Sequence, residues 1–174
     1  MSPTVNLYLK ALIRFGVSFA LLMLFFDIIE GDVRSLVKYF FLLVFFGGFM
    51  SALLVGFHIS KVKELLGKSD LTDEDLATQQ SRTIVSADSP DDILEKIKST
   101  TDFKIKSIQK ESHQISFRRS TSWYSWGENI KITWSKLSDN QYQYEVSSQP
   151  KLFLQFVDYG INLENIQRIE RLIV

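Results

Sequence analysis

Residues 11–29 read ALIRFGVSFALLMLFFDII, and residues 39–57 read YFFLLVFFGGFMSALLVGF. The first stretch has Arg14 and Asp27 as its only charges, and the second stretch has none. Each is close to the roughly 20 apolar residues that a helix needs to cross the hydrocarbon core of a bilayer. The link between them is short, so the two helices should be antiparallel neighbours. These stretches predict a transmembrane hairpin in residues 1–60, with helices at about residues 9–29 and 37–58.

These stretches fit a pair of membrane helices better than they fit a cleaved signal peptide or a buried helix pair of a soluble protein. A signal peptide has a shorter apolar run and a cleavage site with small residues, whereas residues 25–29 are Phe-Phe-Asp-Ile-Ile. Two buried helices would need cover on every side, because both are apolar all round. The rest of the chain is too short to supply that cover, so we expect two retained membrane helices in contact with the lipid bilayer.

Basic residues flank the hairpin more densely than they occupy its link, which predicts its orientation. The flanking residues are Lys10, Arg14, Lys61, Lys63 and Lys68, and those in or beside the link are Arg34 and Lys38. By the positive-inside rule, both termini should lie in the cytoplasm. We therefore expect a multi-pass protein of the inner (plasma) membrane of a bacterium.

Small residues recur at a spacing of four in the second apolar stretch, at Gly48, Ala52 and Gly56, with Gly47 and Ser51 beside them. This spacing lets helix backbones approach closely inside a membrane. We expect these residues to pack the two helices of the hairpin against each other. The alternative is that they join the hairpin to a second copy or to another membrane protein.

The chain changes character after residue 60. Ten of its 14 phenylalanines lie before that point, and the 20 basic and 20 acidic residues lie mostly after it. Residues 61–83 are expected to form a linker, and Val62, Leu65 and Leu66 at its start favour a short amphipathic extension of the second helix that ends at Gly67. Residues 84–174 combine helical and strand patterns and are expected to form a cytoplasmic α+β domain.

The predicted domain begins with a helix, continues with strands and ends with a second helix. Ser89 followed by Pro90 is a helix start. Apolar and polar residues then alternate in four segments, which predicts strands with one buried face. These segments are residues 103–106, 115–118, 130–134 and 142–146. We expect an antiparallel sheet that packs against an N-terminal and a C-terminal helix.

The sequence shows no catalytic or metal-binding motif. The chain has no cysteine, and His58 and His113 stand at no metal-ligand spacing. Glycine-rich phosphate loops and nucleophile elbows are absent as well. The net charge is zero, which argues against nucleic acid as a partner. We expect no cofactor and no metal, and an enzyme with an unrecognised site is the third of three hypotheses on function.

The stretch RRSTSWYSWGEN at residues 118–129 predicts an interaction surface. Its large side chains are Arg118, Arg119, Trp123, Tyr124 and Trp126. They occupy both alternating positions of a strand, and a sheet buried on one side cannot take both sets into its core. Exposed Trp, Tyr and Arg suit a protein hot spot or a bilayer interface. Ordinary packing against the core is the alternative.

The segment from Ser147 to Ile173 is expected to contain a structural turn. Gly160 permits a turn with positive φ, Asp158 can accept backbone N–H bonds within it, and Asn162 should cap the final helix. This arrangement, Ser-Ser-x-Pro followed by Asp-Tyr-Gly-x-Asn and a helix, resembles an uncharacterised domain family of bacterial and plastid membrane-associated proteins. The resemblance implies no activity, and this chain lacks the arginine expected beside the serines.

These features together predict a membrane-anchored binding or accessory protein that presents a cytoplasmic interaction domain. Its expected partners are the lipid headgroup surface or another membrane or cytoplasmic protein. A homo-oligomer is also compatible with the small residues of the second helix. The runner-up hypothesis is a domain that binds a lipid or small molecule in an apolar pocket under its helices.

Overall fold

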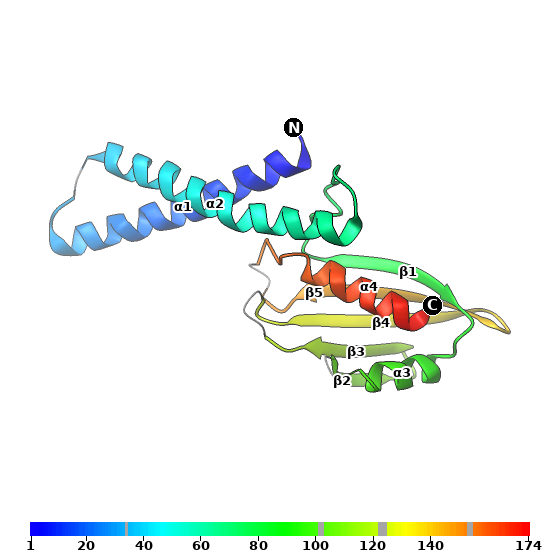
Figure 1. The fold of residues 1–174 in the computed structure, drawn as a ribbon. Helices are drawn as coiled ribbons and strands as arrows, with labels where there is room; N and C mark the ends of the chain where they lie inside the picture. Colours follow the sequence, from blue (N-terminus) through cyan, green and yellow to red (C-terminus); the bar gives the residue numbers. More distant parts are fainter. Residues whose placement is uncertain (34, 101–102, 122–124, 153–154) are drawn as a thin grey trace. The chain divides into compact units, whose positions relative to one another are not determined.

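The structure, a computed structural model, describes residues 1–174 except residues 34, 101–102, 122–124 and 153–154. The chain divides into two units, residues 1–76 and residues 77–174, each with its own packing. Unit 1 consists of two long helices and the turns that follow them, and unit 2 is an α+β domain (Figure 1).

Unit 1 contains helix α1 (Pro3–Glu30) and helix α2 (Leu36–Leu66). Ser2 and Ser35 cap their N-termini with side-chain hydrogen bonds. Both helices are long and apolar enough to cross a membrane. The predicted helical hairpin is therefore present, with helices longer than residues 9–29 and 37–58. Residues 61–66 of the expected linker belong to α2, which ends before Gly67 as the predicted helical extension does.

The two helices meet along a seam of small side chains. The buried residues of the seam are Ala11, Gly16 and Ala20 in α1 and Gly47, Ser51 and Val55 in α2. A Cβ atom on Gly47 would lie 2.5 Å from the carbonyl oxygen of Leu12, and one on Gly16 would lie 2.4 Å from that of Leu43. Only glycine permits this backbone approach at both positions.

The prediction that Gly48, Ala52 and Gly56 form the seam is wrong. A Cβ on Gly48 would have no atom within 4 Å, and Ala52 is exposed. A Cβ on Gly56 would meet only the Tyr8 hydroxyl, at 3.5 Å. The seam uses the neighbouring set, one residue earlier, which has the same spacing of four. Spacing alone does not tell which of two adjacent sets faces the partner helix.

The closed end of the hairpin is held by a cluster of polar side chains. Asp27 is only 7% exposed, and its Oδ2 accepts hydrogen bonds from Lys38 Nζ at 2.5 Å and Tyr39 Oη at 2.7 Å. Asp27 and Lys38 therefore form an ion pair in which their charges offset each other.

Unit 2 is built on a five-stranded sheet in which all neighbouring strands are antiparallel, in the order β1-β5-β4-β3-β2. Its elements are β1 (Gln80–Ser86), α3 (Pro90–Lys98), β2 (Phe103–Gln109), β3 (Gln114–Arg119), β4 (Glu128–Ser138), β5 (Gln141–Pro150) and α4 (Ile161–Ile173). The α+β class is confirmed. Strand β1 is an addition to the predicted elements, so the domain begins with a strand, and residues 80–83 are not part of a linker. Burial alternates along β1, but Ile84 is the only apolar residue at its inward positions, so the sequence shows no alternation of apolar and polar residues.

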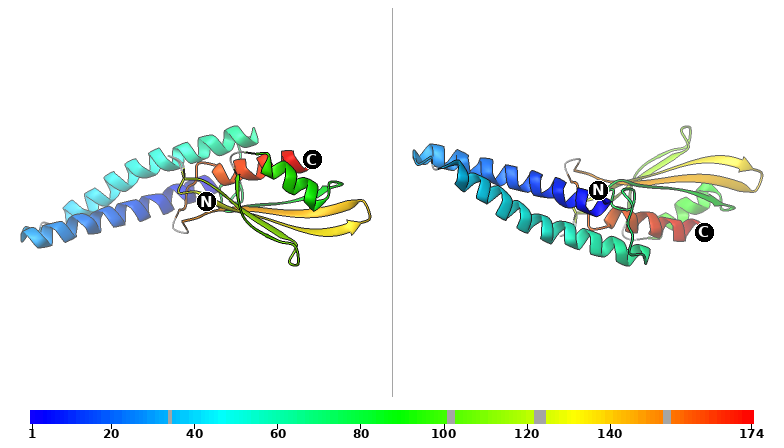
Figure 2. Two further views of the ribbon diagram at one scale, coloured as in Figure 1. Left: turned by 90° about the horizontal axis from the view of Figure 1, so that it is seen from below. Right: turned by 90° about the horizontal axis from the view of Figure 1, so that it is seen from above.

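Helices α3 and α4 lie on the same face of the sheet (Figure 2). The core between them and the sheet contains mainly isoleucines, with Phe103, Phe117 and Tyr144. The predicted start of α3 is confirmed, because Ser89 and Asp92 form a reciprocal capping box. On the opposite face, the strand alternation presents polar side chains.

One end of the sheet is also the end at which the chain enters unit 2. Strands β2 and β4 begin there and β3 and β5 end there, because Phe103 pairs with Arg119 and Glu128 pairs with Pro150. Strand β1 also begins there, because Gln80 pairs with Ser148. We call this the Gln80 end, and residues 77–79 lead into it.

The two adjacent glycines of α2 offer a matched test of the seam. Gly47→Ala should lower the free energy of unfolding of the hairpin by about 1–3 kcal/mol, because the new methyl group overlaps the α1 backbone. Gly48→Ala should change it by less than about 1 kcal/mol, the size of the propensity difference. Reversible unfolding in mixed detergent micelles measures both. A larger loss for Gly48→Ala would place the interhelical contact on the other face of α2.

Candidate functional site: a basic hollow at the Gln80 end

A hollow of about 450 Å³ opens at the Gln80 end of the sheet. Its basic lining residues are Lys104, Lys106, Arg118, Arg119 and Lys151, and Trp126 lines it as well. Lys104, Lys106, Arg118, Lys151 and Trp126 are exposed, and we call these five residues the basic hollow. Such a concentration of positive charge around a concavity is suited to an anionic ligand.

Two strands and two loops bring these side chains together. Lys104 and Arg118 are cross-strand partners in β2 and β3, on the sheet face away from the helices. Lys106 lies at an irregularity in the pairing of β2 with β3, where a strand bends, and it lines the same hollow. Lys151 follows β5, and its backbone N–H donates to Gly127 O at 2.9 Å, which joins its loop to the loop of Trp126.

The four cations of the basic hollow differ from most other cations of unit 2 in their pairing. Among the residues that the structure describes, none of the four forms an ion pair with a carboxylate. Six other basic side chains of unit 2 do, namely Arg82, Lys96, Lys110, Arg119, Lys136 and Arg168. The charge of the basic hollow therefore remains available to a ligand.

The predicted interaction surface is only partly located by the structure. Trp126 is 67% exposed and lies with Arg118 around the hollow. Trp123 and Tyr124 lie outside the described residues. Leu152, on the adjoining loop, is 40% exposed. Lys104, Lys106 and Lys151 were not singled out, because isolated lysines alternating with apolar residues look like any solvated strand face.

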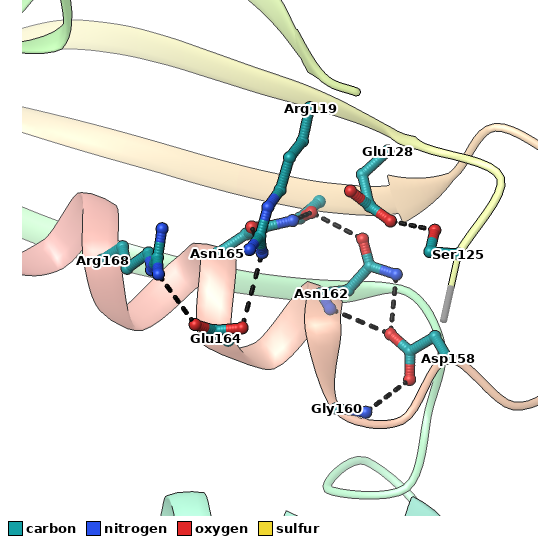
Figure 3. Close-up of polar contacts among 10 residues, drawn as sticks. Arg119, Ser125, Glu128, Asp158, Gly160, Asn162, Glu164, Asn165 and Arg168 are labelled. Carbon is teal, nitrogen blue, oxygen red and sulfur yellow. Dashed lines mark hydrogen bonds and ion pairs between the residues drawn. The ribbon is translucent and has the colours of Figure 1, made fainter. Parts of the chain in front are cut away.

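Arg119 has a different role from its neighbour Arg118. Its guanidinium turns to α4, where Nη1 donates to Asn165 Oδ1 at 3.0 Å and lies 3.4 Å from Glu164 Oε2 (Figure 3). Glu164 also pairs with Arg168 at 3.1 Å. Arg119 thus lines the hollow, but its hydrogen bonds fix α4 to the sheet. Alternation along β3 sends the two adjacent arginines to opposite faces.

A buried polar network continues from Arg119 to the turn before α4. Asn165 donates to Ser148 Oγ at 3.2 Å, and Ser148 donates to Asn162 Oδ1 at 2.6 Å. Asn162 Nδ2 in turn donates to Asp158 Oδ2 at 2.7 Å (Figure 3). These four side chains are at most 1% exposed, and each satisfies another, as buried polar groups require.

The turn before α4 forms as predicted, but its helix cap does not. Asp158 accepts backbone N–H bonds from Gly160 at 3.1 Å and Asn162 at 2.9 Å, and Gly160 has a φ of 73°. Helix α4 begins at Ile161 with Gly160 as its cap, so the assignment of Asn162 as the cap is wrong. Asn162 lies inside the first turn, and its side chain serves the buried network.

Glu128 is the acidic residue of the hollow's lining. It is only 2% exposed, and its carboxylate accepts a hydrogen bond from Ser125 Oγ (Figure 3). Burial raises the pKa of Glu128 above its ordinary value, and nearby Asp158 adds to the increase, while Ser125, Arg119 and Asn165 oppose it. Within the described residues, no group of three His, Cys, Asp or Glu side chains could hold a metal ion.

The two adjacent arginines give a test of the division of roles. Arg119→Gln should lower the free energy of unfolding of the domain by about 1–3 kcal/mol, because it leaves the buried Oδ1 of Asn165 on α4 without its donor. Arg118→Gln should change it by no more than about 0.5 kcal/mol, as expected for an exposed residue. Urea unfolding of the full chain in mild detergent, followed by tryptophan fluorescence, measures both. Equal losses would contradict the assignment.

The raised pKa of Glu128 predicts that the stability of the domain depends on pH. A carboxyl whose pKa is raised in the folded state is more easily protonated there than in the unfolded chain, so its contribution is present at low pH. That contribution is lost as the pH rises from the ordinary carboxyl pKa, about 4.3, through the raised value. Glu128→Gln should remove this decline while it retains an oxygen acceptor for Ser125. Parallel curves of urea midpoint against pH for the two proteins would contradict the prediction.

No protein-family model and no curated protein matches this chain. The basic hollow and the network that supports it are therefore the basis on which a function is proposed.

Proposed function

We propose that this chain is a membrane-anchored binding protein in which α1 and α2 hold unit 2 at a membrane and the basic hollow binds an anionic partner. The observation that supports this most directly is the convergence of four exposed cations, without ion pairs among the described residues, around a hollow with an exposed tryptophan. Charge complementarity of this kind provides specificity and speeds association.

The packing around the hollow favours a role for these charges in binding a ligand over a role in solubility alone. The loop before β4 carries Trp126, and Ser125 ties it to Glu128 and to the Gly127 backbone. The loop after β5 is joined to it through Lys151. The fold therefore holds the cations near one another before a ligand binds. This preorganisation lowers the entropy cost of binding.

We place the protein in the inner membrane of a bacterium, with both termini and unit 2 on the cytoplasmic side. The cations that flank the hairpin support this orientation. Lys38, the basic residue beside the link that weakened the contrast, is paired with Asp27. Two basic residues, Arg34 and Lys38, lie in or beside the link, against five that flank the hairpin.

A small anionic ligand is the second candidate for the hollow. The volume of about 450 Å³ lies within the range of small-molecule sites, about 300–1,000 Å³. Such a ligand would be held by the same cations, and it would keep the protein in the class of membrane-anchored binding proteins. Crosslinking from position 126 covers both kinds of partner, because any ligand beside that position gains a covalent adduct.

Photo-crosslinking in cells tests the hollow as the binding surface. The full chain would carry benzoylphenylalanine in place of Trp126, or in place of Leu137 as a control, since Leu137 is also exposed and apolar but lies near the far end of β4. We expect adducts from position 126 that fall at least tenfold with Lys104→Gln/Lys106→Gln. Mass spectrometry identifies each adduct as protein, lipid or small molecule.

The matched charge control is Lys110→Gln/Lys136→Gln, which removes two exposed lysines elsewhere in the same unit. This variant should leave the adducts unchanged. Adducts that are equal from positions 126 and 137, or that are indifferent to Lys104 and Lys106, would contradict the proposal. Because the chain has no native cysteine, Trp126→Cys also reports the topology. A membrane-impermeant maleimide should label it only after the cells are opened.

A further inference from the structure

We infer that the anionic group bound by the basic hollow is the phosphate of a membrane lipid headgroup, so that the Gln80 end of unit 2 rests on an anionic bilayer surface. This inference rests on the proposed function and specifies its partner. The basic hollow supplies the cations for the phosphates, and Trp126 and Leu152 supply apolar groups for the interface.

The covalent connection of the chain keeps the start of unit 2 close to α2. Leu76 is the last residue of unit 1, and its carbonyl oxygen lies 3.2 Å from Nε2 of His58. His58 directly follows the uncharged stretch 39–57, so this contact holds the end of unit 1 at the boundary of the apolar segment of α2. Residues 77–79 then reach the start of β1, and three residues span at most about 11 Å.

The hollow occupies the end of unit 2 at which this connection arrives. The entry strand β1 and the hollow share the Gln80 end of the sheet. Neighbouring strands of a sheet lie about 4.8 Å apart, so the distance across the sheet from edge strand β1 to edge strand β2 is about 19 Å. The end of the domain that carries the basic hollow is thus the end that is covalently tied to the membrane-crossing candidate α2.

The side chains of the hollow combine the residue types that a bilayer surface attracts. Trp126 and Leu152 are exposed on two adjoining loops that the Lys151–Gly127 hydrogen bond holds together. Lysine and arginine are attracted to anionic lipid surfaces, and tryptophan prefers the headgroup level, where its ring is partly in hydrocarbon and its N–H is hydrated. Exposed apolar side chains beside cations without carboxylate partners among the described residues match such a surface.

The size of the hollow suits a headgroup. Sites for small ligands have volumes of about 300–1,000 Å³. The basic hollow is a single concavity of about 450 Å³ that Trp126 lines, and the exposed Leu152 follows Lys151 in the chain. A phosphate-bearing headgroup fits this shape, and the bilayer supplies many copies at high local concentration.

The test uses the full chain, which has no cysteine of its own. Leu152→Cys, or Leu137→Cys as the control position, would carry an environment-sensitive NBD fluorophore. Each protein would be reconstituted in vesicles of phosphatidylcholine alone or of phosphatidylcholine mixed with phosphatidylglycerol. We expect the emission at position 152 to shift to the blue and to rise only in the anionic vesicles, with no change at position 137.

Three variants of the Leu152→Cys protein locate the interaction. In the Leu152→Cys protein, Lys104→Gln/Lys106→Gln should abolish the blue shift, and Trp126→Ala should reduce it. Lys110→Gln/Lys136→Gln should leave it intact. High salt should also reduce the shift, because it screens exposed charges. A probe that responds equally to neutral and anionic vesicles, or that is indifferent to Lys104 and Lys106, would overturn the inference.

The two experiments fail in distinguishable ways. If the adducts from position 126 depend on Lys104 and Lys106 but consist of protein or a soluble ligand, and the probe at position 152 is silent, the hollow binds an anion other than lipid. The proposed function then stands and the lipid inference is wrong. If the adducts and the probe are both indifferent to these lysines, the proposed function and the inference fail together.

Discussion

The hydrogen bond from Ser148 to Asn162 connects the last strand to the last helix, and the Gln80 end of the domain depends on it. It continues through Asn165 to Arg119 on one side and through Asp158 to the turn on the other. All members except the half-buried Arg119 are buried, and an unmatched buried polar group would cost about 1–3 kcal/mol. The network therefore specifies one position of α4 on the sheet, which apolar contacts alone, being non-directional, would specify less strictly.

This buried network has a direct consequence for the surface beside it. Arg119 is committed to α4 on the helix-bearing face, so Arg118, the next residue, must project from the opposite face. There it meets Lys104 across the strand pair, and neither has a carboxylate partner among the described residues. The same strand thus stabilises the fold with one arginine and exposes a charge with the other. An anionic ligand is the simplest partner for the charge that remains.

The features that were predicted correctly depend on short stretches of sequence. The two apolar helices, the start of α3 and the turn at Asp158 and Gly160 each follow from residues within a few positions of one another. The features that were missed depend on pairing across long distances. Gly47 and Gly48 are equivalent in spacing, and only the α1 backbone distinguishes them. Strand β1 is an edge strand whose inward positions carry Ile84 and otherwise polar residues, so its sequence does not alternate between apolar and polar. Asn162 resembles a helix cap in the sequence, but in the fold its side chain accepts a hydrogen bond from Ser148 of β5.

The distribution of paired and unpaired cations explains how a chain of zero net charge can present a basic surface. Across unit 2, carboxylates lie beside Lys96, Lys110 and Lys136, and on average these exposed pairs contribute little to stability. At the Gln80 end, the acids Glu128 and Asp158 are buried, and they accept hydrogen bonds from Ser125 and Asn162. Their carboxylates accept hydrogen bonds inside the protein, whereas the cations of the basic hollow are exposed to water. The arrangement of charges in the fold therefore gives this end a basic surface that total composition does not reveal.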